Sequence, residues 1–278
     1  MMNWLPIGLV FSLIATNIVA DNCRNFLCDL FECGSFAYQT RLGIYPTIWR
    51  DRGDVFLNSC NCVPGDTAAP ITLGELPKFT NFYKLPWMVS TQLQYAWCGP
   101  ISLYGELNYI QAGHKKTAIN TAAALNSALA IRLSDYRAIS LYVGILYNGD
   151  LCWCDTMGYF VGAKIGFIHH STIDAHQIAV ELPVTASCVC TDVFKRNFLK
   201  KSNKISGGVS AGVDYCLCDR LSLVLTGEVV ISGGPKGAAC IPLLPSEIIQ
   251  FAGGSNLSTS RIKTEISFPI TLGLKYTL

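Results

Sequence analysis

Long segments in which apolar and polar residues alternate strictly constrain this chain more than any other feature of its sequence. The C-terminal segment 262–278 shows the alternation most clearly. Ile266 and Leu272 belong to its apolar series, and Lys263 and Glu265 belong to its polar series. Because successive side chains of a strand point to opposite faces, this pattern predicts a β-strand with one apolar face. The segment is much longer than the about five or six residues typical of strands in soluble sheets.

Ten segments share this alternation, and an even number of strands suits an up-and-down barrel. They are 35–49, 86–98, 101–110, 124–134, 137–147, 157–168, 175–188, 205–217, 221–232 and 262–278. Long and short connections alternate between them, as they do in outer-membrane barrels, where turns gather at one rim and loops at the other. The sequence therefore predicts an all-β fold. We expect a closed antiparallel up-and-down transmembrane β-barrel of about ten strands, with long loops at one rim and short turns at the other.

The N-terminus indicates export. Residues 1–20 have the apolar core and the small final residue, Ala20, of a secretory signal peptide, although an uncleaved membrane anchor is the alternative. We expect a cysteine-containing N-terminal periplasmic segment over 21–34 and the barrel over 35–278, located in the bacterial outer membrane. A chain with 50% hydrophobic and 14% charged residues is too apolar to be disordered. Its net charge of +2 gives no reason to expect nucleic acid as a partner.

Charged residues occur in the polar series of the predicted strands, which would face the barrel interior. They are Arg41, Glu106, Arg132, Lys164, Glu181, Asp214, Glu228, Lys263, Glu265 and Lys275. Basic and acidic residues are equal in number in this set, and an isolated buried charge is strongly unfavourable, so we expect ion pairs across the lumen. Glu106 and Arg132, on consecutive predicted strands, form one hypothesised pair. Balanced charges and about ten strands predict a closed or very narrow lumen.

Glycines and aromatic residues agree with these faces. Glycines in the polar series, such as Gly162 and Gly212, would leave room for larger side chains inside a narrow barrel. Aromatic residues near the strand ends suit the two interfacial girdles of a membrane barrel. They are Phe36, Trp87, Trp97, Tyr109, Tyr159, Phe167, Tyr215 and Tyr276. The ordinary preference of aromatic residues for strands is the alternative explanation.

Thirteen cysteines in an exported chain favour disulfides over metal binding or thiol catalysis. The predicted topology sorts them between the rims, and a disulfide cannot cross the roughly 25 Å between the rims. The predicted periplasmic group is Cys23, Cys28, Cys33, Cys98, Cys216 and Cys218. The predicted extracellular group is Cys60, Cys62, Cys152, Cys154, Cys188, Cys190 and Cys240.

The odd number of cysteines leaves one thiol for a neighbouring molecule, which predicts disulfide-linked multimers. Thiols that stay reduced and unpaired are the alternative. Cys28 and Cys33 alone approach the spacing of a zinc site, and we expect no metal and no other cofactor.

The signal peptide, the alternating strands and the closing strand Ile262–Leu278 resemble bacterial outer-membrane β-barrels over nearly the whole mature chain. The cysteine content and the stretch Cys23–Arg52, with the run from Trp49 to Gly53, are similar to chlamydial major outer-membrane-protein-like porins. The envelopes of that group rely on disulfide cross-linking. The resemblance implies an outer-membrane protein linked to itself or to other envelope proteins through disulfides.

No catalytic constellation is evident in the sequence, and we expect a protein that is not an enzyme. His169 and His170 fall in a short predicted turn, and His114 has no acidic residue near it in the sequence. Two functions remain open. One is a structural, disulfide-linked role in the cell envelope with surface-exposed loops, and the alternative is a small porin or channel for solutes. Outer-membrane lipid is the expected partner in both.

Overall fold

The computed structural model describes residues 34–52, 54–58, 71–76, 78–115, 118–122, 127–150, 156–181, 189–218, 220–237, 241–242, 256–259 and 262–278. The predicted signal peptide and all but the last residue of the predicted N-terminal periplasmic segment lie outside these residues. Among the residues described, no helix has the length and apolar character needed to cross a membrane.

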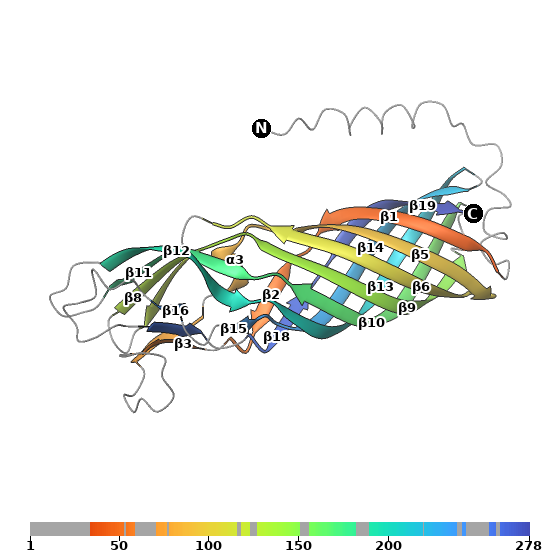
Figure 1. Cartoon of the computed structure of the whole chain (residues 1–278). Helices are drawn as coiled ribbons and strands as arrows, with labels where there is room; N and C mark the ends of the chain where they lie inside the picture. Colours follow the sequence, from red (N-terminus) through yellow and green to blue (C-terminus); the bar gives the residue numbers. More distant parts are fainter. Residues whose placement is uncertain are drawn as a thin grey trace.

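Eight antiparallel strands form a closed ring (Figure 1). In chain order they are β1 (Phe36–Ile44), β5 (Trp87–Cys98), β6 (Ile101–Ala112), β9 (Tyr136–Asp150), β10 (Met157–His170), β13 (Ser202–Cys218), β14 (Leu221–Gly233) and β19 (Ile270–Thr277). Each strand pairs with the next one in the chain, and β19 pairs with β1 to close the ring. This connectivity is the predicted up-and-down barrel.

Two ring strands continue beyond a break at a proline. β2 (Thr47–Arg50) follows β1 after Pro46, and β18 (Thr264–Ser267) precedes β19 before Pro269. β18 pairs with β2 on one side and with β14 on the other. Because proline has no N–H to donate, each ladder is interrupted there and resumes beyond the proline. The predicted strands 35–49 and 262–278 correspond to these interrupted pairs.

The barrel is polar inside and apolar outside. Along β1, Gln39 and Arg41 are buried in the interior, whereas Tyr38 and Leu42 are exposed on the outer face. Arg41 is 2% exposed, against 57% for Leu42. All eight aromatic residues that the sequence assigns to the girdles are exposed on the outer face. The predicted faces are therefore confirmed on the ring strands.

Connections of different length gather at opposite ends of the ring. Gly99–Pro100, residues 151–156 and residues 219–220 join ring strands at one end. Four long connections, 45–86, 113–135, 171–201 and 234–269, leave and re-enter the ring at the other end. Long connections thus gather at one end, as predicted, but three predicted connections change ends. Residues 151–156 belong to the short-turn end, and the predicted turns 134–137 and 169–174 lie at the end of the long connections.

The long connections build two further sheets. The first contains β7 (Ala118–Ala122), β8 (Ser127–Leu133), β11 (Ile173–Glu181), β12 (Val189–Lys200) and β15 (Lys236–Gly237). The second contains β3 (Asp54–Asn58), β4 (Ile71–Glu75), β16 (Ile241–Pro242) and β17 (Asn256–Thr259). These sheets and the short helix α3 (Phe79–Phe82) are called the extension below. Figure 1 shows the extension at one end of the barrel.

The predicted count of about ten strands is not confirmed, because two of the predicted strands belong to the extension. Segment 124–134 contains β8 and segment 175–188 contains most of β11, and these strands pair with each other rather than with the ring. Leu133 and Ile173 are each 1% exposed in an apolar core. Burial of one face against a protein core gives the same alternation as contact with lipid, so the pattern alone does not separate the two environments.

Candidate functional site

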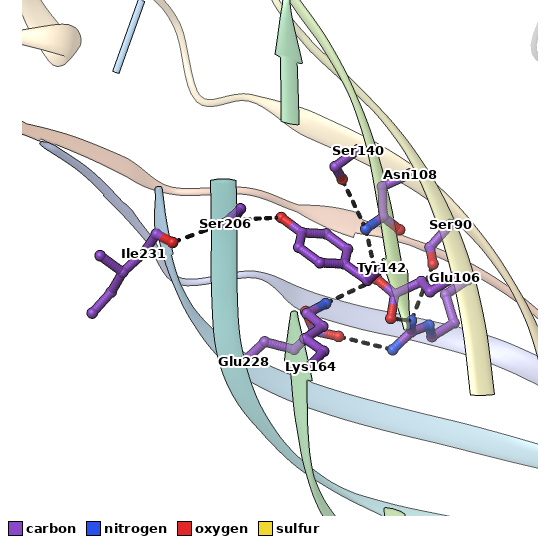
Figure 2. Close-up of polar contacts among 10 residues, drawn as sticks. Ser90, Glu106, Asn108, Ser140, Tyr142, Lys164, Ser206, Glu228 and Ile231 are labelled. Carbon is purple, nitrogen blue, oxygen red and sulfur yellow. Dashed lines mark hydrogen bonds and ion pairs between the residues drawn. The ribbon is translucent and has the colours of Figure 1, made fainter. Parts of the chain in front are cut away.

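Four charged side chains form a closed set of ion pairs across the barrel interior (Figure 2). The Arg41 guanidinium lies 2.9 Å from the Glu106 carboxylate and 3.0 Å from the Glu228 carboxylate. The Lys164 ammonium lies 2.9 Å from Glu106 and also contacts Glu228. Each cation therefore bridges both anions, and no side chain of the set is more than 2% exposed. This set is called the charged layer below.

The charged layer takes one residue from every second strand of the ring. Arg41, Glu106, Lys164 and Glu228 belong to β1, β6, β10 and β14. Small residues stand beside the two cations on the intervening strands. The cross-strand neighbours of Lys164 are Gly144 and Gly208, and those of Arg41 are Ser90 and Gly273. Alternation of large and small side chains lets four long side chains meet in the centre of a narrow barrel.

Glycine is required at several of these positions because the interior is already filled. A Cβ on Gly144 would lie 2.5 Å from the Tyr104 ring, and one on Gly212 would lie 2.3 Å from the Phe160 ring. A Cβ on Gly273 would lie 2.6 Å from the Arg41 side chain. The predicted role of lumen glycines, to leave space for larger side chains, is confirmed at these sites.

Neutral polar groups fix the orientation of the charged layer. Arg41 donates to the Ser90 hydroxyl at 3.0 Å, and the Asn108 amide donates to the Glu106 carboxylate at 2.6 Å. The Lys164 ammonium also lies 4.5 Å from the centre of the Tyr142 ring. Figure 2 shows these residues converging from different strands on the same part of the lumen. A second ion pair, between Lys275 and Asp214 at 2.8 Å, joins β19 and β13.

An apolar cluster covers the end of the ring from which the long connections leave. Its aromatic centre packs Trp49 edge-on against Phe79 at 5.0 Å between ring centroids, and Phe79 against Tyr136 at 5.3 Å. Phe82 and Tyr83, also in this cluster, are 2% and 1% exposed. These residues come from β2, from β9, and from α3 with the residue that follows it, so the extension and the ring share one core. We call this cluster the apolar plug.

One carboxylate is buried beside the apolar plug. Glu265 is 1% exposed and accepts a hydrogen bond from the Trp49 indole N–H at 2.9 Å. The Tyr136 hydroxyl also donates to Glu265, at 3.2 Å, and lies 3.1 Å from His170 Nδ1. Hydrogen bonds to both carboxylate oxygens replace those that water would make, which offsets the cost of burying the charge. Glu265 therefore fixes the position of the plug relative to β18.

The architecture is that of a bacterial outer-membrane β-barrel. Because the ring is closed, each of its strands pairs with a neighbour on both sides and the ring has no free edge. Its outer face is a continuous band of aliphatic and aromatic side chains. No model of a protein family matches the chain, and no curated protein sequence matches it.

Solved structures of outer-membrane proteins are similar to the chain. Neisserial surface protein A is 12% identical over 87% of this chain and 96% of its own, with a TM-score of 0.40. OprG from Pseudomonas aeruginosa is 10% identical over 88% and 97%, with a TM-score of 0.38. Ail, the attachment invasion locus protein of Yersinia pestis, is 9% identical over 89% and 100%, with a TM-score of 0.35. None of these is a chlamydial porin, so that resemblance of Cys23–Arg52 stays a prediction.

Six of the ten predicted lumen charges lie inside the ring, and they comprise the charged layer with Lys275 and Asp214. The hypothesised pair of Glu106 and Arg132 is wrong, because Glu106 binds Arg41 and Lys164. Arg132 is exposed on β8, opposite Gln177 of β11.

The remaining three predicted lumen charges belong to other parts of the structure. Lys263 is exposed ahead of β18, and Glu265 is buried at the plug rather than in the ring. Glu181 ends β11 in the extension, and its side chain lies outside the described residues.

The topology changes the predicted grouping of the cysteines. Residues 151–156 join β9 to β10 at the short-turn end, and the Thr156 carbonyl accepts a hydrogen bond from the Cys216 N–H at 2.8 Å. The connection that carries Cys152 and Cys154 therefore starts at the end of β9 and ends beside β13, at the short-turn end and not at the extracellular end as predicted. Cys98 ends β5 and Cys218 ends β13, at the predicted end.

For the other cysteines, the predicted pairing stays a prediction. Cys190 lies in β12 of the extension, and its side chain is not described. Cys23, Cys28, Cys33, Cys60, Cys62, Cys188 and Cys240, together with Cys152 and Cys154 themselves, lie outside the described residues. Cys216 and Cys218 are not joined to each other. The disulfide assignments therefore stay predictions.

His114 has an acidic partner that the sequence did not indicate. Its Nδ1 lies 2.8 Å from the Asp135 carboxylate, which also accepts the His114 backbone N–H at 3.1 Å. The two residues line a polar cavity of about 410 Å³ with Ser134, Arg137 and Asp174. The partner lies 21 residues away in the chain and is brought close by the β8–β9 connection. In the described part of the chain, no group of three or more His, Cys, Asp or Glu residues is placed to hold a metal ion.

Proposed function

We propose that this chain is a closed outer-membrane anchor that presents the extension at the cell surface. In this role it is a structural and interaction protein of the cell envelope rather than a channel for solutes. The barrel supplies attachment to the membrane, and the long connections supply the surface that meets other molecules.

The charged layer carries this proposal. A conducting barrel needs a continuous path of water, and an eight-stranded ring has an interior only about wide enough for its own side chains. Here Arg41, Glu106, Lys164 and Glu228 meet across that interior and satisfy one another's charges. Separating them to admit an ion would expose unpaired charges in a desolvated site, which is strongly unfavourable.

The apolar plug supports the same function. Trp49, Phe79 and Tyr136 pack together where the long connections leave the ring. A solute that passed the charged layer would still meet this core. The plug also joins the extension to the ring as one packed unit, which a protein that presents a surface requires.

Disulfides between envelope molecules form the second part of the proposal. Cys98, Cys216 and Cys218 lie at the short-turn end, together with the connection that carries Cys152 and Cys154. Several thiols at one rim, in an oxidising compartment, favour linkage within the rim or to an adjacent molecule. We expect disulfide-linked multimers on a non-reducing gel that collapse to a monomer with reductant. A monomer under both conditions would remove the cross-linking role.

Conductance separates the anchor from the small porin. We expect the refolded full chain to give no unitary current steps in a planar lipid bilayer. The control is the variant Lys164→Met/Glu228→Gln, which removes one charge of each sign from the layer. Stable current steps from the unmodified chain, with an ion selectivity that this variant alters, would show a path past the layer and contradict the proposal.

A further inference from the structure

Four exposed lysines gather where the extension meets the ring, on three neighbouring segments. They are Lys200, Lys201, Lys236 and Lys263, and together they are called the lysine patch. Lys200 ends β12 and Lys236 begins β15, which pair with each other. The Ile262 N–H donates to the Pro235 carbonyl, and the Gly234 N–H donates to the Lys263 carbonyl, so the third segment adjoins the second. Figure 1 shows β15 and β18 at this junction.

Two lysines of the patch are direct cross-strand neighbours. Lys200 of β12 stands opposite Lys236 of β15, and both are exposed. Leu199, the residue before Lys200, is fully buried in the apolar plug, whereas the Lys200 side chain is exposed. Like charges directly opposite each other on adjacent strands are destabilising. A bound anion would reverse that effect.

Carboxylates do not neutralise the patch within the described residues. No ion pair there joins any of the four lysines to an acidic side chain. Asp51 adjoins the patch through its carbonyl, which accepts the Lys263 N–H at 3.4 Å. The nearby Glu265 is buried and already bound to Trp49 and Tyr136. The patch therefore has positive charge available for an external partner.

The height of the patch along the barrel indicates which anion it meets. Lys201 lies four residues before Ile205, which is 69% exposed on the lipid-facing side of β13. Lys236 lies five residues after Ile231, which is 54% exposed on β14. At about 3.3 Å per residue along a tilted chain, these lysines stand roughly 10–15 Å beyond the last exposed apolar side chains of β13 and β14. Lipid headgroups occupy this level of a membrane.

We propose that the lysine patch binds the phosphate group of a lipid in the leaflet on the extension side of the membrane. Lys200 and Lys236 hold the phosphate between them, and Lys201 and Lys263 contact it from the adjoining segments. The lipid tail lies against the apolar outer face of β13 and β14. This inference is independent of whether the lumen is closed.

Lipid retention in native mass spectrometry tests the proposal. The full chain is refolded in neutral detergent and incubated with phosphatidic acid or with phosphatidylcholine of the same chain length. We expect selective retention of phosphatidic acid and, in the variant Lys200→Gln/Lys236→Gln, a loss of about tenfold or more, since each lysine near a headgroup contributes substantially. The pair Lys201→Gln/Lys263→Gln gives an independent test if the first variant does not refold.

The matched control is Lys78→Gln/Lys84→Gln, which removes two exposed lysines outside the patch. We expect this control to retain phosphatidic acid as the unmodified chain does. Equal retention by patch and control variants, or equal loss from both, would overturn the proposal. Complete displacement of the lipid by inorganic phosphate at equal concentration would assign the site to a soluble phosphate instead and overturn the lipid assignment.

Discussion

The ring and the extension are built from the same alternating strands but bury opposite faces. In the ring, the buried series is polar, as at Gln92, and the exposed series is apolar, as at Val143, which is 62% exposed. In the extension, the buried residues include Leu133, Ile173 and Phe198, none more than 1% exposed. One region is packed for contact with lipid and the other for contact with water. Alternation therefore indicates a strand whose two faces have different environments. It does not indicate whether the apolar face meets lipid or a protein core.

The two regions are also held together by different interactions. The ring interior depends on charges that bind one another, whereas the extension depends on aromatic packing around α3. Buried ion pairs are sensitive to the loss of a single partner, because the other partner is left unpaired. Aromatic cores lose contact area but leave no stranded charge. Substitutions in the two regions should therefore differ in how much unfolding free energy they remove and in how much of the structure they loosen.

The largest effect is expected in the charged layer. Arg41→Met leaves Glu106 and Glu228 with Lys164 as their one cation, and we expect a loss of about 3–5 kcal/mol in the free energy of unfolding. Denaturant unfolding in lipid vesicles measures it. Arg132→Met, at an exposed position of β8, should change stability by no more than about 0.5 kcal/mol. Equal effects of the two would show that Arg41 is not in a paired, buried set.

A substitution in the apolar plug should loosen the extension and spare the ring. Phe79→Ala removes the ring that packs against Trp49 and Tyr136, and we expect a cost of about 3 kcal/mol, near the lower end for buried aromatic residues because neighbouring rings partly fill the space. Limited proteolysis should then cleave the extension while the ring strands stay protected. Simultaneous loss of protection in both regions would show that the ring depends on the apolar plug for its own stability and contradict the prediction.

On the lipid-facing surface of the ring, the loss of stability caused by an arginine should depend on how deep in the membrane the residue lies. Val143→Arg, in the middle of β9, should cost about 2–4 kcal/mol. Ile101→Arg, at the first residue of β6, should cost no more than about 1 kcal/mol because the charge reaches the interface. Folding yields and unfolding midpoints in vesicles compare the two. A larger cost at Ile101 than at Val143 would contradict the assigned membrane depth.

The smallest effect is a pH dependence confined to the junction with the extension. Burial raises the pKa of Asp135, but the hydrogen bonds from the His114 ring and backbone outweigh it, so the pKa of Asp135 lies below its ordinary value. The lowered pKa stabilises the junction at pH values above the unfolded pKa. This contribution is lost as the pH falls through the folded pKa. The carboxylate is 34% exposed, so the effect is modest.

Hydrogen exchange of the His114–Lys115 segment as a function of pH measures this contribution. Asp135→Asn should abolish the acid-induced increase in exchange. Asp174→Asn, in the same cavity, is the control and should preserve it. An unchanged acid response in Asp135→Asn would assign the effect to another group.

The sequence was sufficient to predict the barrel architecture, the faces of the ring strands and the gathering of loops at one rim. Those features follow from local alternation and connection length. The strand number was not predictable, because β8 and β11 alternate as ring strands do while Leu133 and Ile173 face a protein core. Which strand pairs with which depends on contacts that are distant in the chain, and alternation carries no information about them.

The candidate site was predictable in composition but not in pairing. The sequence placed Arg41, Glu106, Lys164 and Glu228 in the interior and required ion pairs among interior charges. The hypothesis that consecutive predicted strands supply a pair failed because the true partners lie on every second strand of the ring. Gly144 and Gly208 beside Lys164, and Gly273 beside Arg41, leave room for the two long cations to cross the lumen, but they do not identify the carboxylates that these cations bind.

Quenching of tryptophan fluorescence by brominated lipid chains tests most directly that eight strands, and not ten, meet the membrane. Leu141→Trp introduces a probe on the outer face of β9, and Ile131→Trp introduces one on β8, which the ten-strand arrangement would place in lipid. The eight-strand ring predicts added quenching from the probe at position 141 and none from the probe at position 131. Equal added quenching at both positions would place β8 in the membrane and contradict the ring described for this chain.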